Sequence, residues 1–322
     1  MQTILVSDCK KLLVKVYVIG YPECGESIIM LFIDGNNDTV VYSVVIDSYK
    51  LNDGTFKTKD ILVSNNVSYV NLLCWTHPDM DHTKGIDNIV ANFCNKNSSI
   101  WIPIYMNGLD TDPITYNGND KKIIKNLFSN NNRLNKCVKP VSACRNQIGN
   151  IHKITFSDSL NRNLLAEFNV LSPMSDYLVE KIIRNKTIGK NDLSICIMVK
   201  VGPYKFDFCS DIEDITINYM AGEVFEYPLF LKIPHHSSMS SKSFFDKLNN
   251  DSQSVGCTTT YLSQGLPHRE IIERYKTKYM HLHSTGFGQQ NSCCNYGIIE
   301  YYCDLFEKRE IRIRCHGNAY KL

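Results

Sequence analysis

Four side chains that bind divalent cations lie within six positions of this chain, between a short apolar run and a segment with helical spacing. They are His77, Asp79, Asp81 and His82. Imidazole and carboxylate groups at this density are costly to bury unless a cation neutralises them. In an extended turn the alternate residues His77, Asp79 and Asp81 share one side, and His82 turns toward a second point. The spacing therefore predicts two metal positions.

Two further candidate ligands stand at the ends of apolar runs. Asp211 follows the run 206–209, and His235 follows Pro234 at the end of another run. A strand that ends in this way presents its polar side chain at the edge of a sheet, where binding groups from several strands can meet. For His236, the next residue, both a contact to substrate or to a ligand and a packing role are open.

The first motif, His-x-Asp-x-Asp-His, resembles the first metal motif of the metallo-β-lactamase-fold hydrolases, usually His-x-His-x-Asp-His. With Asp79 in place of the second histidine, it is similar to the soluble hydrolase domain of the ComEC DNA-uptake proteins. Further elements similar to that family follow in order, over about residues 15 to 300: a glycine-turn hairpin at 16–32, a strand ending in Asp47, Ser172-Pro173, Asn191-Asp192-Leu193-Ser194, Ser210-Asp211, and Leu231-Lys232-Ile233-Pro234-His235-His236-Ser237-Ser238. Tyr49, Ser210 and Ser237 replace glycine of the family, which affects loop shape more than metal chemistry.

The resemblance implies an α/β fold of four layers, an αβ/βα sandwich in which helices flank two mixed β-sheets and the metal site lies at one edge. It also implies two metal ions that share Asp211. Site one is expected to hold His77, Asp79 and Asp211, and site two Asp81, His82, Asp211 and His235. The usual third histidine motif has no clear counterpart: His152 is the only histidine between His82 and Asp211, and we expect a structural role for it.

The same resemblance implies that a hydroxide bridging two metals attacks the substrate. Asp81 and His236 are the candidate catalytic residues: Asp81 would hold or deprotonate the water, and His236 would contact a ligand or a substrate phosphate. A carboxylate-rich first site shifts the metal preference toward Mn²⁺, and Zn²⁺ is the other candidate.

The composition limits the size of the core, the possible ligands and the cellular location. The 322 residues are 43% apolar, enough for a substantial core, and we expect one hydrolase domain over 1–322. With 35 basic and 33 acidic residues the net charge is +2, so a nucleic-acid ligand would need a local basic patch. The 13 cysteines lie mostly in apolar strands, and the chain shows no signal peptide and no apolar run approaching 18 residues. We expect a reduced, cytoplasmic protein without a membrane span.

The spacing of apolar residues predicts the strands and helices. Strands are predicted at 12–49, 69–76 and 100–105, and through much of 151–235. Helices are predicted at 83–95, 174–186, 240–249 and 267–276, and closing strands at 255–262, 278–283, 296–303 and 309–315. The polar section 107–150 is predicted to be an insert, a lid or binding segment, with one amphipathic piece at 120–128.

The leading hypothesis is a dinuclear metal phosphodiesterase or nuclease acting on DNA, a substrate that rests on the resemblance alone. One alternative is a small-molecule hydrolase opening a lactone, lactam or thioester, favoured by a narrow apolar pocket instead of a basic groove. The other is a non-catalytic partner or regulatory module. Relatives of this subgroup occur in bacterial defence against phage, so a protein partner is a further expectation.

Overall fold

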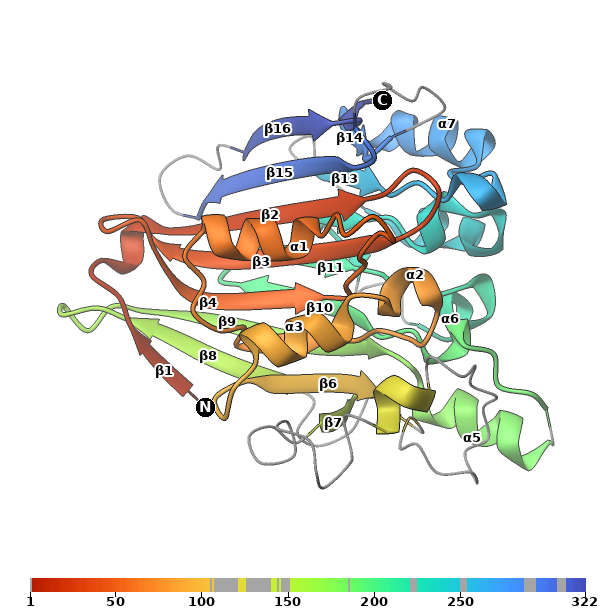
Figure 1. The fold of residues 1–322 in the computed structure, drawn as a ribbon, viewed down its shortest axis with the longest axis horizontal. Coiled ribbons are helices and arrows are strands. Elements are labelled where there is room, and N and C mark those ends of the chain that lie inside the picture. Colours follow the sequence, from red (N-terminus) through yellow and green to blue (C-terminus); the bar gives the residue numbers. More distant parts are fainter. Residues whose placement is uncertain are drawn as a thin grey trace.

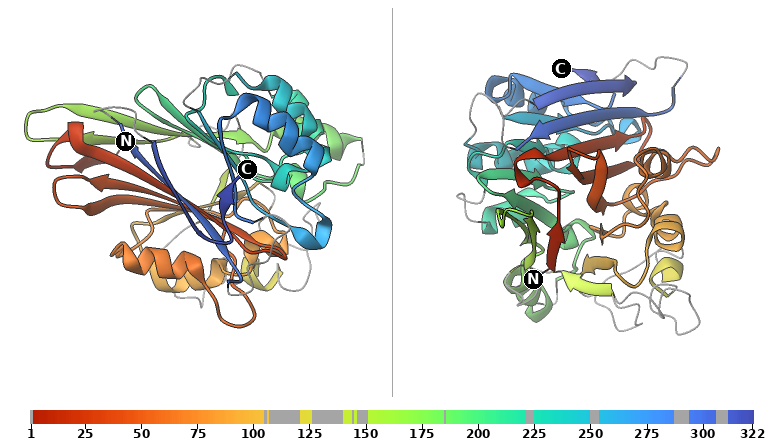
Figure 2. Two further views of the ribbon diagram at one scale, coloured as in Figure 1. Left: turned by 90° about the horizontal axis from the view of Figure 1, so that it is seen from above. Right: turned by 90° about the vertical axis from the view of Figure 1, so that its left-hand side faces the viewer.

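The protein folds as two β-sheets packed face to face, with helices on the outer faces of both (Figures 1 and 2). The computed structural model describes residues 2–104, 106, 121–125, 140–143, 145, 151–184, 186–220, 225–249, 254–286, 294–305 and 311–322. Both sheets mix parallel and antiparallel neighbours. This is the four-layer αβ/βα sandwich that the sequence predicted.

One sheet has eight strands in the order β16-β15-β2-β3-β4-β5-β6-β7. Their bounds are β2 Leu12–Gly20, β3 Glu26–Asp34, β4 Thr39–Ile46, β5 Leu72–Cys74, β6 Ser99–Pro103, β7 Pro140–Ala143, β15 Gly297–Asp304 and β16 Ile311–Gly317. The strands from β4 to β7 run parallel to one another, so their carboxyl ends lie at one edge.

The other sheet has nine strands in the order β1-β8-β9-β10-β11-β12-β13-β14-β17. Their bounds are β1 Gln2–Leu5, β8 Ile151–Ser157, β9 Asn163–Ser172, β10 Cys196–Val201, β11 Tyr204–Phe208, β12 Phe230–Lys232, β13 Val255–Thr258, β14 His281–Ser284 and β17 Tyr320–Lys321. Here β11 to β14 are the parallel set.

Helices cover the outer faces. In the left view of Figure 2 the orange helices α1 and α3 lie against one sheet, and the blue helix α7 lies beyond the other. The α-helices are α1 Lys57–Ser64, α2 Met80–Thr83, α3 Ile86–Phe93, α5 Ser175–Ile183, α6 Asp214–Tyr219 and α7 Arg269–Lys278. Short 3-10 segments are η1 Cys9–Lys11, η2 Asn191–Leu193, η4 His235–Ser237, η5 Met239–Lys247 and η6 Leu262–Gln264.

Side-chain alternation explains how the layers pack. Along β2, Val14, Val16 and Val18 belong to the core between the sheets, whereas Tyr17 and Ile19 belong to the core beneath the helices. Successive side chains of a strand point to opposite faces, so a strand buried on both faces is apolar throughout most of its length, as β3 is. Aromatic rings fill the inter-sheet layer: Phe32 lies 5.1 Å from Phe156 and 6.3 Å from Phe168 between ring centroids.

Most predicted elements form, with several differences. The segment predicted to be a helix at 240–249 is the 3-10 segment η5. The helices α1 and α6 and the strands β1 and β17 form where no element was predicted. Within the section 107–150, where a polar insert was predicted, residues 121–125 are helical, 140–143 form β7 and Arg145 forms an isolated bridge with Met174. The other residues of that section lie outside the described residues.

Two expectations concern the chain as a whole. No helix in the described part is long and apolar enough to cross a membrane. The ten cysteines that the structure describes all have free thiols.

Candidate metal centre

The first histidine motif lies at the carboxyl end of β5, in the position that the sequence predicted. His77 lies between β5 and α2, Asp79 directly precedes α2, and Asp81 and His82 are in α2. The indole Nε1 of Trp75 donates to Thr83 Oγ1 at 3.0 Å, which holds this loop against α2. His77, Asp81 and His82 are buried, whereas the Asp79 side chain is 37% exposed.

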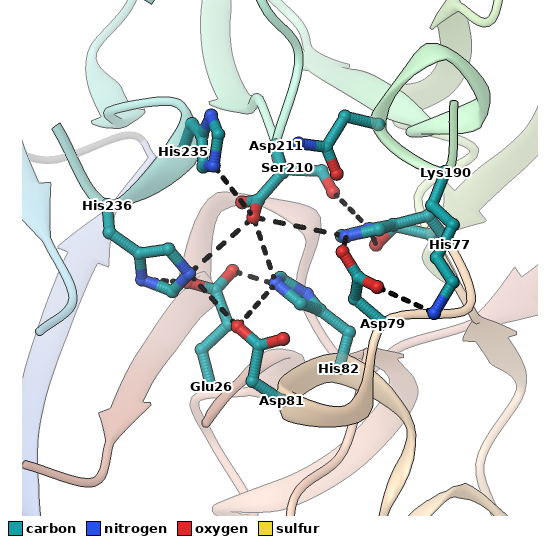
Figure 3. Close-up of polar contacts among 12 residues, drawn as sticks. Glu26, His77, Asp79, Asp81, His82, Lys190, Ser210, Asp211, His235 and His236 are labelled. Carbon is teal, nitrogen blue, oxygen red and sulfur yellow. Dashed lines mark hydrogen bonds and ion pairs between the residues drawn. The ribbon is translucent and has the colours of Figure 1, made fainter. Parts of the chain in front are cut away.

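The second set of groups comes from the opposite sheet. Asp211 follows β11 and the histidine pair follows β12, so parallel strands deliver both to the same edge. The pair lies in an unusual turn: His235, His236 and Ser237 have φ of 47°, 49° and 61°. L-residues rarely adopt this left-handed conformation, and here it turns both imidazoles toward Asp211 (Figure 3).

Four side chains converge at the centre of the site (Figure 3). One ligand atom from each of four buried residues lies within 4.8 Å of the other three; the residues are Asp81, His82, Asp211 and His236. His82 Nε2 lies 3.4 Å from both Asp81 Oδ2 and Asp211 Oδ2. His236 Nε2 lies 3.2 Å from Asp81 Oδ2 and 3.6 Å from Asp211 Oδ2.

The other predicted ligands surround Asp211 on a second side. His77 Nε2 lies 3.9 Å from Asp211 Oδ2 and 3.7 Å from Asp79 Oδ2. His235 Nε2 also lies 3.9 Å from Asp211 Oδ2, and its side chain is 19% exposed. Asp79 Oδ1 is paired with the Nζ of Lys190 at 2.9 Å. Asp211 is thus adjacent to both sets of groups, the place expected of a shared ligand.

The two histidines of the pair therefore differ from their predicted places. The sequence placed His235 with Asp81 and His82, but the imidazole within this group is His236. His235 lies toward solvent, where its Nδ1 is 2.9 Å from Ser240 Oγ and 3.3 Å from Glu213 Oε1. The left-handed turn decides which ring points inward, and sequence spacing carries no information about it.

Several buried polar atoms of this site have no hydrogen-bond partner among the described residues: His77 Nε2, His82 Nε2 and Asp211 Oδ1. Buried polar groups are nearly always paired, and an orphan of this kind calls for an explanation such as an ion. All three atoms belong to groups that bind divalent metals, and the three side chains meet at one place in the fold. The donor set therefore fits one or more divalent cations.

The charges of the site point the same way. Burial alone would raise the pKa of the Asp81 and Asp211 carboxyls, but the neighbouring His82 and His236 lower both. Burial likewise would lower the pKa of His82, yet Asp81, Asp211 and Asp47 raise it. Asp79 has its pKa lowered to about 2, because His77 and Lys190 outweigh its burial. Clustered carboxylates thus demand positive charge, which bound cations would supply in place of protonated imidazoles.

Asp47 holds the first motif in place. It directly follows β4 and adopts a φ of 56°. One carboxylate oxygen accepts from the Thr76 amide at 2.7 Å, and the other accepts from the Thr76 hydroxyl at 2.6 Å and lies 2.7 Å from His82 Nδ1. A carboxylate on Nδ1 orients an imidazole so that its Nε2 faces a metal.

Sequence reasoning missed a buried group behind His236. Glu26, at the start of β3, and Lys232, at the end of β12, form an ion pair between Oε2 and Nζ of 2.9 Å. Thr259, which follows β13, donates to the same Glu26 oxygen. A lysine inside an apolar run was the available signal, because a buried ammonium needs a carboxylate partner.

Ser210, Ser237 and Tyr49 stand where the resembled motifs have glycine. Ser210 and Ser237 have φ of 47° and 61°, which glycine adopts without strain. Tyr49 packs on Gly25, whose φ is 108°; a Cβ atom at this glycine would lie 2.3 Å from the Tyr49 ring.

His152, the only histidine between His82 and Asp211, lies away from the metal centre. Its Nε2 is 2.7 Å from the Tyr42 hydroxyl, and its ring lies against Tyr42, Trp101 and Phe168. Burial lowers its pKa. These contacts agree with the structural role expected of it.

Comparison with known proteins gives only distant likeness. No family model matches the chain, and no curated protein sequence does. One similar solved structure is a diphosphatase from the PhnP family, with 13% identity and a TM-score of 0.42, covering 84% of this chain and 94% of that one. Another is zinc-bound PqqB from Methylobacterium extorquens, with 9% identity and a TM-score of 0.35, covering 67% and 71%. At this similarity neither protein's activity transfers to the present chain.

Proposed function

We propose that this protein is a dinuclear metal-dependent hydrolase that cleaves phosphodiester bonds of nucleic acid, with DNA as the substrate. The observation that carries the metal-dependent part is the convergence of four buried ligand atoms, together with the unpartnered His77 Nε2, His82 Nε2 and Asp211 Oδ1 among the described residues. Buried carboxylates and imidazoles in this density are the donor set of a divalent metal site.

The distances suggest how the ligands divide. We propose that one ion is held by Asp81, His82, Asp211 and His236, and a second by His77, Asp79, Asp211 and His235. Relative to the sequence prediction, His236 becomes a ligand of the more buried ion and His235 moves to the more exposed one. The proposed ions are Zn²⁺ or Mn²⁺; Asp79 favours the harder ion, and the imidazoles suit zinc.

Two divalent ions that share a ligand polarise a phosphoryl oxygen and lower the pKa of water. The protein's own contribution is to orient and to accept a proton. We propose that Asp81 holds or deprotonates the attacking water, since its carboxylate is at the centre of the buried group. Asp47 keeps His82 oriented during this step.

Nucleic acid as substrate rests on the resemblance of the His-x-Asp-x-Asp-His motif to that of the ComEC hydrolase domain, and one surface feature supports it. A groove of about 210 Å³ is lined by Lys15, Glu300, Tyr302, Arg312 and Arg314. It is formed across β2, β15 and β16, where Lys15 is the register partner of Tyr302 and Tyr302 that of Arg312. We call this the basic groove.

The basic groove combines cations with an aromatic ring. The Nζ of Lys15 and the guanidinium of Arg312 each lie 5.9 Å from the Tyr302 ring centroid. Its acidic member, Glu300, is engaged by the Tyr17 hydroxyl at 3.5 Å and by His316 at 3.3 Å. Cations beside an accessible aromatic ring are a common platform for single-stranded nucleic acid. Phage defence and an obligatory protein partner stay predictions from the resemblance.

The test separates metal binding from substrate choice. Protein reconstituted with Zn²⁺ or Mn²⁺ is analysed for metal content and incubated with plasmid DNA, single-stranded DNA, RNA, a model phosphodiester and a lactone. We expect two ions per chain and cleavage of DNA and of the model diester. Asp211→Asn should lose at least one ion and Asp81→Ala should abolish cleavage, whereas Asp87→Asn, an exposed carboxylate on α3, should match wild type.

Each outcome has a distinct meaning. Wild-type protein that retains no transition metal would overturn the proposal. Metal binding with hydrolysis of the lactone alone would replace the phosphodiesterase by the small-molecule hydrolase, and full cleavage by Asp81→Ala would remove Asp81 from the mechanism.

A further inference from the structure

A chain of buried polar contacts runs behind His236 and joins the two sheets. It begins at Lys232 on β12, whose Nζ donates to Glu26 Oε2 at 2.9 Å and to the carbonyl oxygen of Ile233 at 3.1 Å. Glu26 belongs to β3 of the other sheet, and both side chains are almost completely buried. Thr259 then connects Glu26 to the imidazole of His236 (Figure 3 shows Glu26 beside His236).

The direction of the hydrogen bonds follows from how many protons each group has. Glu26, paired with an ammonium, is a carboxylate and has no proton to donate. Thr259 has one hydroxyl proton, and it donates that proton to Glu26 Oε2. Toward His236 Nδ1, 2.8 Å away, the Thr259 oxygen can therefore only accept. Nδ1 must carry the hydrogen of this bond.

A second contact favours the same arrangement. His236 Nδ1 lies 3.5 Å from the negatively charged Glu26 Oε2, which stabilises a proton on Nδ1 and destabilises a lone pair there. The other ring nitrogen, Nε2, faces Asp81 and Asp211. A neutral imidazole with its proton on Nδ1 presents its lone pair at Nε2, the form that binds a metal.

We propose that Lys232, Glu26 and Thr259 form a relay that holds the proton of His236 on Nδ1 and thereby presents Nε2 as a metal ligand. The three are positioning residues, since they act through His236. The inference rests on the proposed metal-binding function for its purpose, but the proton position is a property of the metal-free protein as well.

The ion pair between Lys232 and Glu26 fixes the direction of the hydrogen bonds in the relay. A buried ion pair contributes little net stability, because desolvation offsets most of its attraction. Here Lys232 keeps Glu26 ionised inside the core, and an ionised Glu26 is what fixes the direction of the Thr259 hydroxyl. If Glu26 were protonated it could donate to Thr259, and the direction of the whole chain would become ambiguous.

The chain offers a matched control one residue away. Thr260 is as buried as Thr259, but its hydroxyl has no hydrogen-bond partner among the described residues. Thr→Val keeps the shape of the side chain and removes only the hydroxyl. Thr259→Val therefore breaks the relay, Thr259→Ser keeps its hydroxyl, and Thr260→Val removes a hydroxyl that the relay does not use.

The first measurement is made without metal. Long-range ¹H–¹⁵N NMR of the full-length, metal-free protein distinguishes a protonated from an unprotonated ring nitrogen. We expect His236 Nδ1 to be protonated in wild type, in Thr259→Ser and in Thr260→Val. In Thr259→Val we expect a population with an unprotonated Nδ1. An unprotonated Nδ1 in wild type would overturn the relay, whether or not the protein binds metal.

The second measurement is the affinity for Zn²⁺ and Mn²⁺ by chelator competition. Removing a hydrogen bond behind a metal-binding histidine typically costs ~10-fold to ~100-fold in affinity, and we expect a decrease in this range for Thr259→Val. Thr259→Ser should regain most of it, and Thr260→Val should equal wild type. Equal affinities for Thr259→Val and wild type would refute the relay while leaving the metal site intact. If wild type binds no metal but Nδ1 is protonated, the proposed function fails and the relay stands. Circular dichroism of each variant confirms folding.

Discussion

Replacing Asp207 by asparagine should stabilise the protein, and increasingly so as the pH rises. Asp207 lies on β11 between the register partners Met198 and Leu231. It is fully buried, and neither carboxylate oxygen has a hydrogen-bond partner among the described residues. Burial raises its pKa from 3.8 to about 8, and the attraction of Lys205 offsets only part of this. At neutral pH Asp207 is therefore a protonated carboxylic acid inside the sheet.

The sign and size follow from proton linkage. The folded protein keeps this proton up to a pH of about 8, whereas the unfolded chain releases it near pH 3.8. Stability contributed by the neutral form is thus complete below pH 3.8 and is lost as the pH rises toward 8. Each pH unit in this window costs about 1.4 kcal/mol, which sums to about 4 kcal/mol at pH 7. Asparagine has nearly the same shape and cannot ionise, so the variant avoids this cost.

The assay is urea-induced unfolding of metal-free wild type and Asp207→Asn between pH 5 and 8. The difference in unfolding free energy should grow in favour of the variant by about 1.4 kcal/mol per pH unit, or about 3 kcal/mol between pH 5 and pH 7; the cost of the extra amide donors lowers it by a constant amount. The exposed Asp87→Asn serves as the control and should show a difference that is flat with pH. A difference for Asp207→Asn that does not change with pH would show that Asp207 is ionised in the folded protein.

Two other predictions concern the surface and the core. Lys15→Glu combined with Arg314→Glu should weaken binding of single-stranded DNA, measured by fluorescence anisotropy, and should reduce the log–log slope of affinity against salt by about one unit for each phosphate that is no longer neutralised. Hydrolysis of a small diester should not change. Unchanged DNA binding would exclude the basic groove as a nucleic-acid contact. His152→Phe should leave the metal content unchanged, because the partner of His152 is the Tyr42 hydroxyl. It should lower the unfolding free energy by about 1–3 kcal/mol, because that hydroxyl is left unpaired. Elemental analysis tests the first part and urea unfolding the second, and a fall in metal content would make His152 a ligand.

Where the spacing is local, the sequence predicted which side chains the structure brings together. The motif from His77 to His82 combines ligand density with an apolar strand before it, and both are visible in one short segment. The same holds for Asp211, because a carboxylate at the end of an apolar run can be recognised without its neighbours. The choice between His235 and His236 could not be made in this way, since it depends on three successive left-handed residues.

What escaped prediction was mostly pairing between distant segments. Glu26 and Lys232 are far apart in sequence and meet only because β3 and β12 belong to facing sheets. The basic groove arises in a similar way: Lys15, Tyr302 and Arg312 are neighbours only through strand register. The helix α1 lacked a strong apolar period, and its formation depends on packing against the sheet more than on its own sequence.

The strands at the two ends of the fold are exchanged between the sheets. β1 pairs with β8 in the nine-stranded sheet, although β2 to β7 build the other sheet; β15 and β16 return to pair with β2. A chain divided between β6 and β8 would therefore give two fragments that each hold an edge strand of the other's sheet. Neither fragment would carry a whole metal centre, because His77 and His82 belong to one and Asp211 and His236 to the other. Co-expressed fragments should thus assemble only as an interlocked pair, and metal uptake would report their reassembly.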